Sequence, residues 1–219
     1  YDDLGILSSE PELGEDLSRL FNELSGHSAK HDYSRILVAP HSLRKGLLSR
    51  IHRETKNHLE GKTAWIRLKL NSLLDEEIIA ALYEAADAGV KIEIIVRGIC
   101  ALQFSTQAQR DNIKVRSILG RFLEHSRIYY FKNDGAEEYY IGSADVMQRN
   151  LDRRVEALVR IDAEKHKNRL RHILDDSVSE NYSTWSLLDD NQWQRKARDF
   201  DGNLLVNFQD YFVEKHNRA

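Results

Sequence analysis

The sequence predicts an α/β fold in which a mixed β-sheet is flanked by helices. Between residues 65 and 96, an apolar strand pattern, an amphipathic helix and a second apolar strand pattern follow one another. This order is typical of two parallel strands joined by a right-handed crossover. The apolar runs 128–131 and 138–141 flank the turn signal Asn133-Asp134-Gly135, which predicts an antiparallel hairpin. A sheet that holds both arrangements is mixed.

Residues 1–35 are expected to be the end of a preceding domain and a linker. The apolar run at 4–7 predicts a strand, residues 14–24 predict a helix, and the polar stretch 25–31 predicts the linker. The apolar residues expected on one face of this helix are Leu17, Leu20, Phe21 and Leu24. We therefore expect a second domain to occupy residues 36–219.

Strands and helices alternate in the next part of the chain. A helix that starts near Ser42 ends at Gly61, and the helix after Asp75 begins with acidic residues, which the helix macrodipole favours. Gly89 is suited to end this second helix. The strands predicted here lie at residues 36–39, 65–70, 90–96 and 115–119.

The C-terminal part is predicted to add a strand at 155–161 and a charged helix at 163–175. Residues 182–203 are polar and low in apolar period. Trp185 and Trp193 are expected to anchor this segment to the body of the domain. A last apolar stripe at helical spacing predicts a docking face. Its residues are Leu204, Leu205, Phe208, Tyr211 and Phe212.

Composition describes an ordinary soluble protein, with 41% hydrophobic and 31% charged residues. No apolar run has the length of a membrane span, and one cysteine cannot form an internal disulfide. We therefore expect a cytoplasmic location, with peripheral attachment to a membrane left open. The net charge of -3 argues against general nucleic-acid binding. Residues 97–154 are nevertheless basic, with ten Lys and Arg against seven Asp and Glu, which suits a polyanionic substrate.

Polar residues at the predicted strand ends indicate a phosphate site. Histidine can act as nucleophile or as general acid and base, and the planar guanidinium of arginine binds phosphate oxygens in pairs. The hairpin is expected to bring the residues before its first strand and those after its second strand to one edge of the sheet. The candidate residues are Arg97, His125, Arg127, Ser143, Asp145, Arg149 and Asn150.

The spacing of two short motifs resembles the phospholipase D-like superfamily. In that superfamily a His-x-Lys pair is followed by a Gly-Ser-x-Asn segment. Here His125 is followed by Arg127 in place of the lysine, and Gly142-Ser143 is followed by Asp145 in place of the asparagine. The resemblance implies a phospholipase D-like mixed sheet flanked by helices.

Within that superfamily the chain is more similar to the polyphosphate kinases of the first bacterial family, over nearly its whole length. Five blocks carry the resemblance: Val96-Arg97-Gly98-Ile99-Cys100, residues 112–118, residues 121–127, residues 140–145, and residues 147–156. A weaker match at residues 4–7, 20–22 and 69–75 keeps the same register. Val146 departs from the family, which usually carries tryptophan there, so one stacking surface for a nucleotide is lost.

The resemblance implies a reaction and a set of partners. The complete enzyme would transfer the terminal phosphoryl group of ATP reversibly to inorganic polyphosphate through a phosphohistidine. That histidine would lie upstream, in a similar domain whose end is residues 1–35. Mg²⁺ would accompany ATP or ADP, although no Asp/Glu set identifies its ligands. The upstream domains and further copies of the chain would be its protein partners.

The resemblance also implies roles for single residues. His125 would contact the nucleotide phosphates and act as the second histidine of the reaction, and Arg97 would bind ATP. Tyr1 aligns with a nucleotide-contacting tyrosine. The remaining candidates, Arg127, Ser143, Asp145, Arg149 and Asn150, would support them.

Two other functions stay open on the sequence alone. One is a phosphodiesterase that dimerises to complete two His-x-Arg half-sites, which would hydrolyse a generic diester as the purified chain. The other is a non-catalytic module that binds polyanions. Its binding would survive the loss of His125 and would fall with salt.

Overall fold

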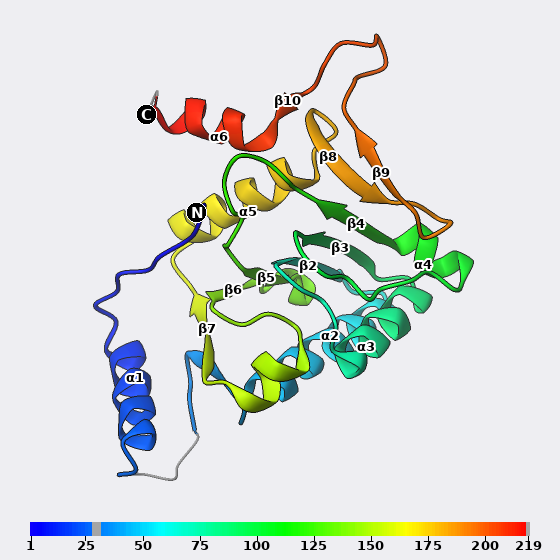
Figure 1. The fold of residues 1–219 in the computed structure, drawn as a ribbon. Helices are drawn as coiled ribbons and strands as arrows, with labels where there is room; N and C mark the ends of the chain where they lie inside the picture. Colours follow the sequence, from blue (N-terminus) through cyan, green and yellow to red (C-terminus); the bar gives the residue numbers. More distant parts are fainter. Residues whose placement is uncertain (28–31, 218–219) are drawn as a thin grey trace.

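The computed structural model describes residues 1–27 and 32–217, and a mixed sheet with helices on both faces forms its centre (Figure 1). Within these residues the sheet has ten strands in the order β1-β7-β6-β5-β2-β3-β4-β8-β10, and β9 pairs with β8. The strands are β1 Ile36–Ala39, β2 Trp65–Leu70, β3 Lys91–Val96, β4 Ile113–Ser117, β5 Ile128–Phe131, β6 Glu138–Gly142, β7 Glu156–Ile161, β8 Tyr182–Leu187, β9 Trp193–Lys196 and β10 Val206–Asn207. The helices are α1 Pro11–Leu24, α2 Leu43–Leu59, α3 Glu76–Asp87, α4 Gln107–Asn112, α5 Glu164–Val178 and α6 Phe208–Asn217, with short helical turns η1 Asn133–Gly135 and η2 Arg149–Arg153.

The predicted mixed sheet is confirmed. Strands β2, β3 and β4 are parallel neighbours, whereas β5 runs antiparallel to β2 and β6 antiparallel to β5. In this register Lys69 of β2 lies opposite Ile128, the first residue of β5, and Ile128 lies opposite Ile141 of β6. The ends of β2, β3 and β6 and the start of β5 therefore lie at one edge of the sheet.

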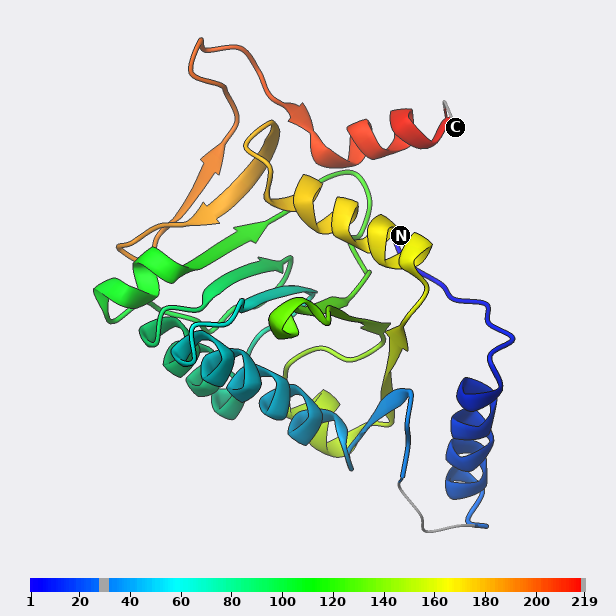
Figure 2. The ribbon, with the colours of Figure 1, turned by 180° about the vertical axis from the view of Figure 1, so that it is seen from behind.

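Alternate residues of the central strands bury their side chains on opposite faces. Ile94 and Val96 of β3 belong to a core cluster with helices α2 and α3, while Ile95 between them packs in a second cluster with α5 and Phe208 of α6. Figures 1 and 2 show α2 and α3 on one side of the sheet and α5 on the other. Because both faces are covered, even the charged side chains Arg67 and Lys69 of β2 are buried.

The N-terminal segment differs from its prediction. No strand forms at residues 4–7, and the side chain of Leu7 is fully exposed. A strand needs a neighbour for its backbone groups. Among the described residues only Asp2 pairs here, in an isolated parallel bridge to Glu124. Of the predicted linker 25–31, residues 28–31 lie outside the described residues.

Helix α1 is confirmed but starts at Pro11, a residue suited to the first helical turn. Its buried face also differs from the prediction. Leu13 and Leu20 pack against Ile36 and Val38 of β1, whereas the three other predicted residues are exposed. These three are Leu17, Phe21 and Leu24.

Two corrections concern the C-terminal part. The polar segment 182–203, for which no helix or strand was predicted, contains the antiparallel strands β8 and β9, and Trp193 at the start of β9 is exposed rather than a buried anchor. Trp185 is half-buried on β8. The last apolar stripe does form a helix, α6, but Leu204 precedes it and is exposed, while Phe208 is buried. Strand β4 also begins two residues earlier than predicted, at Ile113.

Candidate functional site

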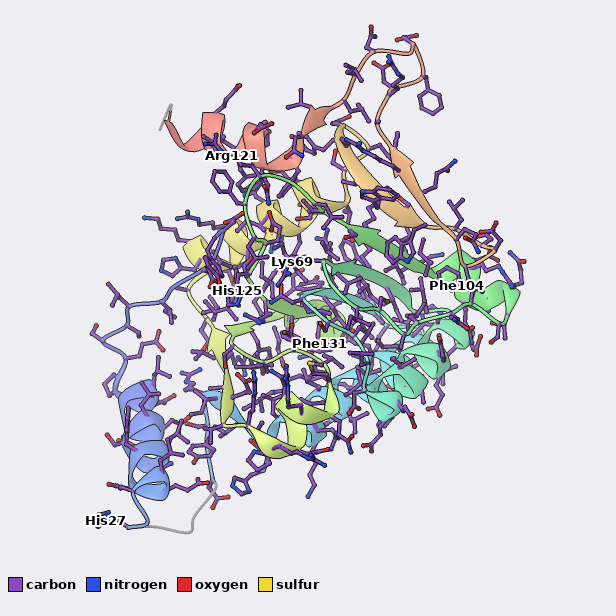
Figure 3. All side chains as sticks on the ribbon, viewed as in Figure 1. His27, Lys69, Phe104, Arg121, His125 and Phe131 are labelled. Atoms are coloured by element: carbon purple, nitrogen blue, oxygen red, sulfur yellow. The ribbon has the colours of Figure 1, made fainter. Side chains whose placement is uncertain are left out.

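The candidate residues come from strand ends that meet at one edge of the sheet. Asn71 follows β2, Arg97 follows β3, and Asp145 follows β6, while His125 and Arg127 precede β5. In Figure 3 the labelled side chains of Lys69 and His125 lie near each other at this edge. We refer to residues 120–127, which lead into β5, as the histidine loop.

Arg127 and Asp145 form a buried, two-point ion pair. Nη2 of Arg127 lies 3.0 Å from Oδ2 of Asp145, and its Nε donates to Oδ1 at 3.3 Å. The same Oδ1 accepts the backbone N–H of Asn71 at 2.7 Å and that of Ser72 at 3.3 Å. Asp145 thus joins the histidine loop to the end of β2. The Nε and Nη2 donors of Arg127, which could bind a phosphate, are already bonded to this carboxylate.

His125 is the partly exposed group of the cluster, with 34% of its side chain accessible. Its Nδ1 lies 2.8 Å from Oδ2 of Asp3, so a proton on Nδ1 leaves Nε2 as the nitrogen that can exchange a proton with a ligand. Nη1 of Arg127 donates to the backbone carbonyl of His125 at 3.0 Å and lies 3.3 Å from Nδ1 and 3.4 Å from Nε2. The ring is therefore held by a carboxylate and a guanidinium.

Asp3 is ionised beside this histidine. Partial burial alone would raise the pKa of Asp3, but the hydrogen bonds with the His125 ring and the Leu4 N–H outweigh it, and the pKa lies below its ordinary value. The ring of Tyr1 meets the His125 ring edge-on with centroids 5.3 Å apart. Tyr1 itself is largely exposed. The first three residues of the chain thus lie against the predicted catalytic histidine.

Arg97 is the cation best placed to bind an anion at this edge. Its Nε donates to the backbone carbonyl of Glu124 at 2.7 Å and to Oδ1 of Asn71 at 3.0 Å. Across the described part of the chain, its two terminal nitrogens have no hydrogen-bond or ion-pair partner. Arg97 is therefore anchored through Nε next to the residue that precedes His125, with its paired donors available.

A buried charged network underlies the histidine loop. Nζ of Lys69 lies 2.6 Å from Oε2 of Glu124 and 2.7 Å from Oγ of Ser126, and all three side chains are buried. Glu124 and its neighbour Asp2 are close enough to interact, and burial and then Glu124 raise the pKa of Asp2. A buried lysine in a central strand requires an acidic partner, and this requirement is the signal that could have identified Glu124 from the sequence.

The other predicted residues are placed differently. Ser143 is exposed, and its Oγ accepts the backbone N–H of Ala157 at 3.3 Å. Asn150 is buried in η2, where its Nδ2 donates to Glu156 at 2.7 Å. Arg149 is exposed on the same turn. In residues 1–27 and 32–217, no hydrogen bond or ion pair links Arg149 or Asn150 to His125.

Comparison with known proteins assigns the family. Residues 36–207 match the model of the polyphosphate kinase C-terminal domain 2. The polyphosphate kinase of Streptomyces coelicolor is 49% identical over 218 residues, a match that covers 100% of this chain and 29% of that protein. This chain belongs to the polyphosphate kinase family. It spans less than a third of the length of that curated relative.

A solved structure of the family shares the fold of this chain. The crystal structure of the polyphosphate kinase from Porphyromonas gingivalis matches with a TM-score of 0.87 and 33% identity, covering 97% of this chain and 33% of that one. Nuc from Salmonella typhimurium, a phospholipase D family member, is a distant neighbour with a TM-score of 0.49 and 17% identity over 74% of this chain. The predicted membership of the polyphosphate kinase family is confirmed.

Proposed function

We propose that this chain is the C-terminal catalytic part of an enzyme that transfers the ATP γ-phosphate reversibly to inorganic polyphosphate. The phosphorylated histidine of this reaction would lie in the part of the protein upstream of the chain. The proposal depends on one observation: Arg97 and His125 lie at the same edge of the sheet. Arg97 is bonded through Nε to the carbonyl of the residue before His125, and its terminal nitrogens have no partner among the residues that the structure describes.

This edge of the sheet provides a cationic group that can bind phosphate oxygens and a histidine that can transfer a proton, and phosphoryl transfer uses both. Charge spreads over the phosphoryl oxygens during transfer, so positioned cationic donors stabilise it. Arg97 would bind these oxygens, and Arg127, neutralised largely by Asp145, would hold the histidine loop. With Asp3 bonded to Nδ1, His125 would carry a proton on Nε2 to or from a phosphate oxygen. Tyr1 would lie against the nucleotide beside this ring.

Mg²⁺ is expected to accompany ATP. Among the residues that the structure describes, no group of three or more His, Cys, Asp and Glu side chains could hold a metal ion. Within the same residues, no helix is long and apolar enough to cross a membrane.

Several expectations complete this proposal. A domain boundary at residue 35, with residues 1–35 ending an upstream phospholipase D-like domain, stays a prediction. So do the assembly of several copies, the binding of ADP in the reverse reaction, and a cytoplasmic location. The contacts of Asp2 and Asp3 with the histidine loop support a close association between this N-terminal segment and the second domain.

Replacing Arg97 by glutamine in the complete enzyme tests the proposal. We expect the kcat/KM for ATP to fall at least about tenfold, since a charge-assisted pair is lost. Arg110→Gln is the matched control, because Arg110 lies on α4 and bonds the backbone of Asp189 away from this edge. Equal kinetics for the Arg97 variant and the control would contradict the proposed site.

A further inference from the structure

Gln209, on the C-terminal helix α6, is bound to the histidine loop. It is 2% exposed and lies just beyond residues 36–207, the part of the chain that matches the family model. Its Oε1 accepts the backbone N–H of Phe122 at 2.6 Å, and its Nε2 donates to the carbonyl of the same residue at 2.8 Å. The amide therefore pairs with Phe122 as a neighbouring β-strand would.

The same amide also reaches the residue that precedes His125. Nε2 of Gln209 donates to Oε1 of Glu124 at 2.9 Å, while Lys69 holds the other carboxylate oxygen at 2.6 Å. The backbone carbonyl of Glu124 is bound by Arg97. Glu124 is thus held by Gln209 of α6, by Lys69 of β2 and by Arg97 at the end of β3. Because Glu124 and His125 share a peptide bond, these contacts also restrict the position of His125.

Gly120 makes room for this contact. A Cβ atom added at residue 120 would lie 2.4 Å from Oε1 of Gln209 and 3.0 Å from Oδ1 of Asn207. Asn207 in turn accepts the backbone N–H of Gln209 at 2.9 Å. A side chain at residue 120 would therefore displace the amide of Gln209 while leaving the glutamine in the sequence.

We propose that Gln209 is a positioning residue, which sets the place of His125 by holding Phe122 and Glu124. This inference rests on the proposed function only in assigning His125 to the reaction. Gln209 touches no reacting group. Catalytic groups must be held to within a fraction of an ångström, and a misplacement of about 1 Å can cost about a hundredfold in rate. A helix at the far end of the sequence would thereby control turnover at this site.

The test uses Gln209→Met and Gly120→Ala in the complete enzyme. Methionine keeps the volume of glutamine without its hydrogen bonds, and the alanine displaces the amide instead. In both variants we expect faster backbone hydrogen exchange in residues 120–125, a kcat about tenfold to a hundredfold lower, and a KM for ATP within about twofold of the starting value. Lys215→Ala is the control, since it removes an ion pair between α6 and Asp176 of α5 without touching the loop. It should leave both exchange and kcat unchanged.

Three results would overturn the proposal. Unchanged exchange in residues 120–125 would show that Gln209 does not hold the loop. Faster exchange with unchanged kcat, in an enzyme that His125→Ala inactivates, would show that the loop needs no such positioning. Faster exchange over the whole domain, with a loss of folding in both variants, would assign Gln209 to overall stability. If His125→Ala itself keeps normal turnover, the role proposed for His125 in the reaction fails, whereas the exchange experiment still decides whether Gln209 holds the loop.

Discussion

At the scale of single residues, the two arginines of the site differ in which of their hydrogen-bond donors are available to a ligand. Within the described residues Arg97 is bonded through Nε alone and keeps its terminal donors, whereas Arg127 uses the same kind of donors on Asp145. Position along the chain does not separate them, because each lies next to a predicted strand end. The difference arises from Asp145, which also caps the backbone N–H groups of Asn71 and Ser72 and is therefore fixed beside Arg127.

Replacing His125 by alanine in the complete enzyme should lower the rate of polyphosphate synthesis by about a hundredfold or more, because general acid and base groups contribute on this order. Partial exposure of His125 means that the fold should tolerate the change. Steady-state kinetics measure the effect, and circular dichroism checks folding. Near-normal turnover would show that His125 has a structural role and takes no part in the reaction.

Replacing Arg127 by lysine should act differently. The charge stays but the two-point contact with Asp145 is lost, so we expect the free energy of unfolding to fall by about 1–2 kcal/mol. Substrate affinity should fall as well, since the histidine loop loses its link to the end of β2. Urea denaturation and the KM for ATP measure the two effects. A variant with unchanged stability would show that the Arg127–Asp145 pair does not hold the loop.

At the scale of secondary structure, the elements with a strong pattern could be predicted from the sequence. The unit of β2, α3 and β3 and the hairpin of β5 and β6 were identified because apolar runs, Asp75 and the turn at residues 133–135 all agreed. Helix α4 was missed although Thr106 and Gln109 form a capping box, a local signal. Strands β8 and β9 were missed because they are partly exposed and carry no apolar alternation.

Gly142 at the end of β6 gives a prediction about sheet geometry. A Cβ atom there would lie 1.9 Å from the carbonyl oxygen of Ala157 on β7, so Gly142→Ala requires the two strands to move apart. We expect a loss of at least about 1–3 kcal/mol in the free energy of unfolding. Gly5→Ala is the control, since nothing lies within 4 Å of that position, and it should change stability by less than about 0.5 kcal/mol. Equal stability of the two variants would contradict the close approach of β6 and β7.

Glu137 of the β5–β6 hairpin accepts a hydrogen bond from Arg171 of α5. The lowered pKa of Glu137 predicts that the stability of the fold depends on pH. Partial burial alone would raise the pKa of Glu137, but hydrogen bonds from Lys132, Arg171 and Tyr130 lower it to about 2, from an ordinary value of 4.5. Because the pKa is lower in the folded protein, ionised Glu137 stabilises the fold above pH 4.5, and this contribution is lost as the pH falls towards 2.

Glu137→Gln should therefore lower the melting temperature at pH 7 and flatten its decrease between pH 4.5 and pH 2. Calorimetry of both proteins over this range measures the effect. Parallel curves for the two proteins would mean that Glu137 does not contribute to the acid sensitivity of the fold.

At the scale of the whole molecule, the sequence could predict those site residues that lie next to strand ends and no others. The register of β2, β5 and β6 brings His125, Arg127 and Asp145 together, and the hairpin predicted that arrangement. Asp3, Lys69 and Gln209 could not be found in this way, because each reaches the histidine loop from a distant part of the chain. Only the folded chain shows that both its N-terminal segment and its C-terminal helix contact one loop.

The last prediction concerns this chain in isolation. If the phosphorylated histidine lies upstream, the purified chain should not label itself when incubated with ATP that carries a radioactive γ-phosphate, whereas the complete enzyme should. A free Nε2 on His125 is chemically able to accept a phosphoryl group, but Nη1 of Arg127 lies 3.4 Å from this nitrogen and Asp3 holds Nδ1. A phosphohistidine is labile in acid, so labelled protein is measured before and after acid treatment. Acid-labile label on the isolated chain, lost in His125→Ala, would make His125 the nucleophile and overturn the division of roles proposed here.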